Sequence, residues 1–346
     1  MNKYIEIEGR KIGKDYPPIV IAEIGINHNG SLQVAKEMVD AAYNAGAEIV
    51  KHQTHIVEDE MCKSAKYVKP GNSDKSIYDI MEDAALNEQD EKELKQYVEE
   101  KGMIFLSTPF SRAAVERLER LGVSAYKIGS GECNNYPLIE HIASKGKPMI
   151  IATGMNDIDS VKETVRIVEK YKVPYALLHT TNLYPTKFEE VRLGAMKELE
   201  ENFPNAVIGL SDHTINNNAC LAAVALGASI VERHFTDTKQ RVGPDIICSA
   251  DESELKELII SSKQIYSMQG GQKKALPAEK VTINFAFATI VTTKAIKKGE
   301  LFTKDNIWVK RPNNGGILAK HYNEVIGKVA SCDILEDTQL TLDMIE

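Results

Sequence analysis

The chain has 346 residues, a formal net charge of -8 and the composition of an ordinary globular protein. Such an acidic chain lacks the basic face that nucleic acid or an anionic membrane requires, so we expect neither as a partner. The length exceeds what one small core needs and predicts two domains, or one barrel with an appendage.

Cysteine usage and the first residues indicate the cellular compartment. The five cysteines are widely spaced and form no CxxC pair, which is typical of reduced thiols in a cytosol. Polar Asn2 and Lys3 follow the first methionine, and no apolar run approaches the length of a membrane span. We therefore expect a cytoplasmic protein.

The first predicted element is a hairpin over residues 4–13, which turns at Glu8-Gly9. After Pro17-Pro18 a unit repeats, consisting of a buried apolar run, a polar tip and an amphipathic helix. The apolar runs span 19–25, 47–54, 103–110, 125–131, 148–154, 175–181, 207–213 and 229–236. Eight such units predict an α/β fold, a closed (β/α)8 TIM barrel. An open doubly wound sheet is the alternative, but no Gly-rich phosphate loop follows the first run.

Two segments depart from this repeat. Residues 55–86 form a long insert that contains Pro70-Gly71-Asn72, and an insert of this length beside a barrel mouth predicts a lid or a partner contact. Residues 269–284 are punctuated by Gly, Lys and Pro and predict a linker. We expect residues 1–268 to form the barrel domain with its hairpin, and 285–346 a small, mostly β domain.

The most informative stretch is a predicted βαβ unit over residues 207–236. Its two strands end in His213 and His234, with a helix predicted over 216–227 that carries apolar Cys220, Val224 and Leu226. Two neutral imidazoles at neighbouring strand ends could hold a divalent metal and leave positions open for a substrate. Either histidine alone would more often be a packing residue, and only their pairing favours a metal site.

Polar residues at the carboxyl ends of all eight strands should converge on one mouth. The candidates are Glu23, Lys51, Gln53, Thr108, Lys127, Ser130, Glu132, Asn182, Tyr184, Ser211, His213, His234 and Asp245. Two lysines together with Ser, Asn and Tyr resemble an anion cradle more than a single imine-forming lysine. For any single acid or lysine, a structural ion pair is the competing interpretation.

Several long stretches make the chain similar to the bacterial N-acetylneuraminate synthase family. They are EIGINHNGS (23–31), VKHQTHIVEDEM (50–61), STPFSRAA (107–114), YKIGSGECNNYPLI (126–139), GLSDHT (209–214), ERHFTD (232–237), GPDI (243–246) and VKRP (309–312). The resemblance implies a barrel joined to a small antifreeze-like (SAF) domain, in a domain-swapped homodimer. It also implies condensation of phosphoenolpyruvate with N-acetylmannosamine and water, with release of phosphate. One departure is Ala152, where the resemblance predicts a serine that could hold phosphate.

The resemblance further implies a role for each candidate. His213 and His234 would bind the metal, most readily Mn2+, with Mg2+ or Co2+ as alternatives. Glu23 or Glu132 would handle the attacking water. Phosphoenolpyruvate would bind Lys51, Thr108, Lys127, Ser130, Asn182, Tyr184 and Ser211. The sugar would bind Glu23, Gln53, Tyr184 and Asp245, together with Phe285 and Arg311 of the C-terminal domain of the partner subunit.

Three rival functions stay open at this point. A legionaminate or pseudaminate synthase would use a different N-acetylated hexose. An aldolase would form a Schiff base between Lys127 and pyruvate. An ice-binding or carbohydrate-binding protein with an inactive barrel is the third, and the retained polar strand ends argue against it.

Overall fold

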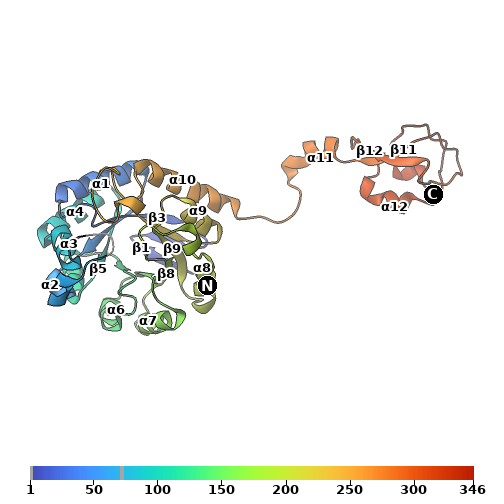
Figure 1. Cartoon of the computed structure of the whole chain (residues 1–346). Helices are drawn as coiled ribbons and strands as arrows, with labels where there is room; N and C mark the ends of the chain where they lie inside the picture. The colour runs from blue at the N-terminus through green and yellow to red at the C-terminus, as the bar shows by residue number, and fades with distance from the viewer. Residues whose placement is uncertain (1–2, 71–73) are drawn as a thin grey trace. The chain divides into compact units, whose positions relative to one another are not determined.

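The computed structural model describes residues 3–70 and 74–346, and it divides into two compact units at Gly270. In the first unit eight parallel strands close into a barrel, in the order β10-β3-β4-β5-β6-β7-β8-β9, and helices surround it (Figure 1). The strands are β3 (Ile19–Gly25), β4 (Ile49–Thr54), β5 (Ile104–Pro109), β6 (Tyr126–Ile128), β7 (Met149–Ala152), β8 (Tyr175–Thr180), β9 (Val207–Asp212) and β10 (Ile230–His234). The predicted (β/α)8 fold is confirmed.

One helix follows each barrel strand and packs its apolar face on the outside of the sheet. These helices are α1 (Leu32–Ala45), α4 (Glu88–Glu100), α5 (Arg112–Leu121), α6 (Tyr136–Ala143), α7 (Ile158–Lys170), α8 (Gly194–Asn202), α9 (Asn218–Ala225) and α10 (Glu252–Met268). Caps fix their starts: Ser31 caps α1 and Asn87 caps α4, each by accepting a backbone N–H of the first turn.

The extent of α9 corrects part of the sequence interpretation. The helix spans Asn218–Ala225 rather than 216–227, so Leu226, which we included in it, lies just after its end and is 44% exposed. Cys220 and Val224, four residues apart in the helix, are both buried.

The N-terminal hairpin closes one end of the barrel. Strands β1 (Tyr4–Ile7) and β2 (Arg10–Gly13) pair antiparallel, as predicted. One buried cluster contains the hairpin residues Ile5, Ile7 and Ile12 together with residues near the amino ends of the barrel strands, such as Ile21 and Ile49. Because this end is filled by apolar side chains, the polar strand ends face a mouth at the opposite end only.

The insert after β4 contains short helices rather than an irregular loop. They are α2 (Val57–Glu60), a 3-10 helix over Lys63–Tyr67 and α3 (Ile77–Ala84). Gly71 and Asn72 of the insert lie outside the described residues. Contacts between α2 and α3 hold the insert together, and contacts between α2 and α5 attach it to the barrel.

The second unit has its own core. Strands β11 (Thr289–Thr292) and β12 (Ile307–Lys310) pair antiparallel, and Ile290, Phe302 and Leu340 are fully buried. A short α12 (Tyr322–Val325) and two 3-10 turns, Ala319–His321 and Leu342–Met344, complete it. The predicted linker is partly helical, because a 3-10 turn (Pro277–Glu279) leads directly into α11 (Lys280–Ala286).

No helix in the described part of the chain is long and apolar enough to span a membrane.

Candidate active site

The carboxyl ends of the barrel strands surround a cavity of about 440 Å³. Every barrel residue that the sequence suggested lines it, namely Glu23, Lys51, Gln53, Thr108, Lys127, Ser130, Glu132, Asn182, Tyr184, Ser211, His213, His234 and Asp245. Phe285 lies on α11 and Arg311 follows β12, so both belong to the second unit, where their side chains are exposed.

Strand register brings the charged residues of the cavity floor together. Glu23 on β3 is paired with Lys51 on β4 and with His234 on β10. The Glu23 carboxylate forms an ion pair with the Lys51 ammonium, and both side chains are almost completely buried. Burial alone would raise the pKa of Glu23, but the charges of Lys51, His234 and Lys127 outweigh it and lower this pKa below its usual value. The floor therefore holds a buried carboxylate in its ionised form.

Glu232 is a floor residue that we did not select from the sequence. Its Oε1 atom lies 3.4 Å from Lys127 Nζ and 3.8 Å from Lys51 Nζ, and it accepts a hydrogen bond of 3.1 Å from Ser211 Oγ. Its Oε2 atom is buried without a hydrogen-bond partner among the described residues. The available signal was strand alternation, because Glu232 lies two residues before His234 and therefore on the same inward face.

The pKa values of the two lysines are shifted in opposite directions. Burial lowers the pKa of Lys127, helped by the nearby Lys51 charge and opposed by Glu232. For Lys51 burial also lowers the pKa, but Glu23 and Glu232 outweigh it and raise this pKa above its usual value. An incoming anion would favour the charged form of both lysines, as an anion cradle requires.

Gly154 lies close to Asn182 and Ser130, two of the predicted phosphoenolpyruvate ligands. A Cβ atom on Gly154 would lie 1.8 Å from Asn182 Oδ1 and 2.8 Å from Ser130 Oγ, so a larger residue would displace these two side chains. The Gly154 N–H donates to Ser130 Oγ over 3.1 Å. Ala152 lines the same cavity, and its methyl group offers no hydrogen bond.

The two histidines lie side by side, with ring centroids 5.2 Å apart. His213 Nδ1 lies 2.7 Å from the carbonyl oxygen of Thr181. A carbonyl only accepts, so Nδ1 carries the proton and the lone pair is on Nε2. Burial lowers the pKa of His213 to about 3, which keeps the ring neutral. His234 Nδ1 is buried without a hydrogen-bond partner in the described chain, and Asp245 Oδ2 is 3.7 Å away.

This donor set fits a divalent transition metal. A neutral imidazole whose other nitrogen is fixed by a carbonyl is the usual form of a metal-binding histidine. Among the described residues no group of three or more His, Cys, Asp or Glu side chains is arranged to hold a metal by itself. Two nitrogen ligands would leave the remaining coordination positions to substrate and water.

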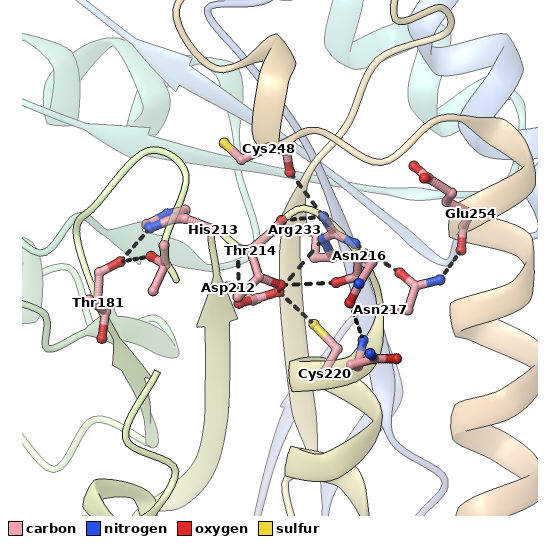
Figure 2. A network of polar contacts seen from close by, with 12 residues as sticks. Thr181, Asp212, His213, Thr214, Asn216, Asn217, Cys220, Arg233, Cys248 and Glu254 are labelled. Carbon is pink, nitrogen blue, oxygen red and sulfur yellow. Dashed lines mark hydrogen bonds and ion pairs between the residues drawn. The ribbon is translucent and has the colours of Figure 1, made fainter. Parts of the chain in front are cut away.

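A buried arginine fixes the loops that carry these ligands (Figure 2). The Arg233 guanidinium donates to Asn217 Oδ1 (2.9 Å) and to the carbonyl oxygens of Thr214 (2.7 Å) and Cys248 (3.0 Å). Thr214 follows His213, and Cys248 follows Asp245 by three residues. Arg233 thereby ties the loops after β9 and β10 together behind the cavity.

We expect Arg233→Met to destabilise the protein by about 3–5 kcal/mol, because it leaves Asp212 buried without its nearest cation, 3.8 Å away. Urea unfolding measures this change. The double variant Arg233→Met/Asp212→Asn should recover part of the loss, since the uncompensated carboxylate is gone. An unchanged unfolding midpoint in the single variant would contradict the role given to Arg233.

Comparison with known proteins decides the family. The family model described as the NeuB family matches residues 38–274, and the SAF domain model matches residues 287–346. The chain belongs to the NeuB family. The resemblance seen in the sequence is thereby confirmed, including the C-terminal SAF domain.

Relatives and solved structures cover nearly the whole chain. The N,N'-diacetyllegionaminic acid synthase of Campylobacter jejuni is 38% identical over 92% of this chain and 97% of its own length. The human N-acetylneuraminate-9-phosphate synthase is 32% identical over 98% of this chain and 95% of its own. The crystal structure of the N-acetylneuraminic acid synthetase of Leptospira borgpetersenii, in complex with citrate, superposes with a TM-score of 0.74 at 29% identity, over 82% and 96% of the two chains.

Proposed function

We propose that this NeuB-family protein condenses phosphoenolpyruvate with an N-acetylated hexose and water, and releases phosphate and a nonulosonate. The observation that carries the proposal is the cavity itself, where a floor with two buried lysines adjoins two neighbouring imidazoles. The lysine floor suits a small, highly charged anion, and the imidazole pair suits a divalent metal, most readily Mn2+. When bound, such a metal would supply Lewis acidity towards the sugar aldehyde.

Different side chains of the cavity would bind phosphoenolpyruvate and stabilise the charge that develops during the reaction. Lys51 and Lys127 hold the anionic groups of phosphoenolpyruvate, whose enol carbon forms a bond to the aldehyde carbon of the open-chain sugar. Positive charge then develops at the carbon that bears phosphate, where the ionised Glu23 stabilises it. Water adds to this carbon and loses a proton to a carboxylate, and the former aldehyde oxygen takes up a proton to become a hydroxyl. In the tetrahedral adduct the oxygen from water then forms the ketone as the C–O bond to phosphate breaks, and its remaining proton leaves with the phosphate.

Glu23 and Glu132 suit opposite tasks because their surroundings shift their pKa values apart. The pKa of Glu23 is lowered, whereas burial, with the nearby charge of Glu60, raises the pKa of Glu132 to about 7. A neutral carboxyl donates a hydrogen bond, and an ionised one accepts a proton. We therefore assign the water's proton to Glu23 and a hydrogen bond to the sugar to Glu132.

The pKa of Glu132 predicts a pH dependence of stability. Between its usual value of 4.5 and about 7, the unfolded chain loses this proton while the folded protein keeps it. The free energy of unfolding should therefore fall with rising pH across this window, relative to Glu132→Gln, whose amide does not titrate. Urea unfolding of both proteins at pH 5, 6 and 7 measures the difference, and parallel curves would contradict the raised pKa.

N-acetylmannosamine is the acceptor that the sequence resemblance implies, and its product would be N-acetylneuraminate. A second acceptor class has specific support, because the Campylobacter diacetyllegionaminic acid synthase is 38% identical and the human synthase 32%. An acceptor of that class would carry a second acetamido group. Ile77, Ile80 and Met81 of α3 form an apolar part of the cavity lining that could receive an acetyl methyl group.

The decisive experiment is a phosphate-release assay with phosphoenolpyruvate and a panel of N-acetylated hexoses, with one and two acetamido groups. We expect phosphate release with acceptors of one of these two classes, and a metal chelator should abolish that release. Release of no phosphate with any acceptor would refute the proposal. Trapping of pyruvate on Lys127 by borohydride would instead favour the aldolase.

The same proposal includes a homodimer in which Arg311 and Phe285 serve the partner's sugar site. Both side chains are exposed on their own unit and so are available to a ligand. Mixing inactive Arg311→Ala with inactive His234→Ala under subunit exchange should restore about half the wild-type activity in each heterodimer, because one site is then intact. If the subunits exchange and no activity returns, Arg311 does not act in the partner.

A further inference from the structure

A chain of hydrogen bonds runs from Glu60 in the insert through His55 and Gln53 to Glu23 on the cavity floor. Glu60 Oε2, at the end of α2, lies 2.8 Å from His55 Nδ1. His55 Nε2 lies 3.0 Å from Gln53 Oε1, and Gln53 Nε2 donates to Glu23 Oε1 over 2.6 Å. The chain therefore links the insert to the carboxylate that faces the reaction.

Donor and acceptor roles are forced along this chain. The Glu23 carboxylate, paired with Lys51, only accepts, so the amide nitrogen of Gln53 faces Glu23 and its oxygen faces His55. An amide oxygen also only accepts, so His55 Nε2 carries a proton. One further proton then lies between His55 Nδ1 and Glu60, whether the imidazole or the carboxyl holds it.

Packing holds His55 and α2 in place. The His55 side chain is 1% exposed and stacks on Phe110, with ring centroids 4.4 Å apart and planes 11° from parallel. The α2 helix is anchored separately, because Asp59 Oδ2 accepts the backbone N–H of Ala113 at the start of α5, over 2.8 Å. With the ring and the helix fixed, the Gln53 amide has one orientation that satisfies both of its neighbours.

We propose that Glu60 and His55 are positioning residues that fix the Gln53 amide and, through it, the Glu23 carboxylate for the acceptor sugar. The proposal rests on the proposed function. Gln53 and Glu60 both line the cavity, whereas the two lysines that would hold phosphoenolpyruvate both pair with Glu232, which lies outside this chain of hydrogen bonds. Loss of the chain should therefore affect the acceptor far more than phosphoenolpyruvate.

Kinetics of two variants test this selectivity. His55→Phe keeps the ring stacked on Phe110 but removes both nitrogens, and Glu60→Leu removes the last link. Each should lower kcat/KM for the acceptor by about 10- to 100-fold, the usual cost of losing an outer positioning partner, and leave the KM for phosphoenolpyruvate within about twofold. Equal losses for both substrates would overturn the proposal, because they would indicate a structural role only.

Glu60→Gln is the conservative variant. Its amide N–H can donate to Nδ1 of a neutral His55, so the direction of every other bond in the chain is kept. At pH 6 it should recover most of the acceptor kcat/KM that Glu60→Leu loses. Glu58→Gln, an exposed change on the same helix, is the matched control and should behave as the wild type. If Glu60→Gln is as impaired as Glu60→Leu, the hydrogen-bond chain is not what positions Gln53.

A measurement independent of activity tests the chain directly. In protein labelled with 15N-histidine, the His55 signals are those that His55→Phe removes. We expect Nε2 of His55 to be protonated in the wild type and in Glu60→Gln, and an unprotonated Nε2 in the wild type would overturn the proposal. If the wild type releases no phosphate with any acceptor, the proposed function fails, while a protonated Nε2 still supports the bonding chain.

Discussion

His213→Ala and His234→Ala should each abolish phosphate release while the protein stays folded. His213 offers a lone pair on Nε2 because its Nδ1–H is held by the Thr181 carbonyl, and buried His234 has an Nδ1 without a hydrogen-bond partner in the described structure. With two nitrogen ligands available, removal of either leaves one, which is too few to retain a metal at ordinary concentrations. Loss of a Lewis acid worth about 4 kcal/mol lowers a rate about 1,000-fold.

Elemental analysis of the purified variants measures the metal directly, and thermal unfolding checks the fold. His141→Ala is the control, because His141 lies on α6, pairs with Glu116 and does not line the cavity. Wild-type metal occupancy in either single variant would remove His213 and His234 from the metal site.

The second large effect is expected at Lys127. Lys127→Met should weaken phosphoenolpyruvate binding by about 2–5 kcal/mol, roughly 30-fold to several thousandfold, and change acceptor binding little. The reason is that a compact buried cation is what localises a small anion in a protein of net negative charge. Calorimetric titration of each ligand measures the two affinities.

Folding must be separated from binding in this variant. Among the residues that the structure describes, Lys127→Met leaves Glu232 with Lys51, 3.8 Å away, and Ser211 as its polar partners, so stability should also fall. The double variant Lys127→Met/Glu232→Gln removes the uncompensated carboxylate and should recover stability but not phosphoenolpyruvate affinity. Equal losses of affinity for both ligands in the single variant would show that Lys127 is structural.

Sequence pattern predicted the barrel well because its signals are local and repeated. Each apolar run is one strand, and the side chain after it marks the mouth, so Glu23 and His234 could be placed together before their register was known. The start of α4 is likewise a local feature, because the Asn87 side chain accepts the backbone N–H of Asp90 there. These features depend on neighbours in the chain and need no tertiary information.

Other features depend on contacts between distant segments. Glu232 belongs to the cavity floor because Lys51 and Lys127 from two other strands converge on it, and the pattern alone marks it only as inward-facing. The bond between His55 and Glu60 requires that the chain after β4 turns back as α2, which the sequence suggested only as an insert. Leu226 was misplaced because the end of α9 was set two residues too late.

Because the hairpin fills one end of the barrel, the cavity opens only at the other end. This determines the order in which substrates bind and products leave. Lys51 lies one inward position deeper than Gln53 on β4, so the anion site that we propose is the innermost and the proposed sugar site is nearer the opening. A sugar that arrived first would block the passage to the lysines. We therefore expect phosphoenolpyruvate to bind before the sugar. Phosphate, which forms at the inner end of the cavity, should dissociate only after the nonulosonate product.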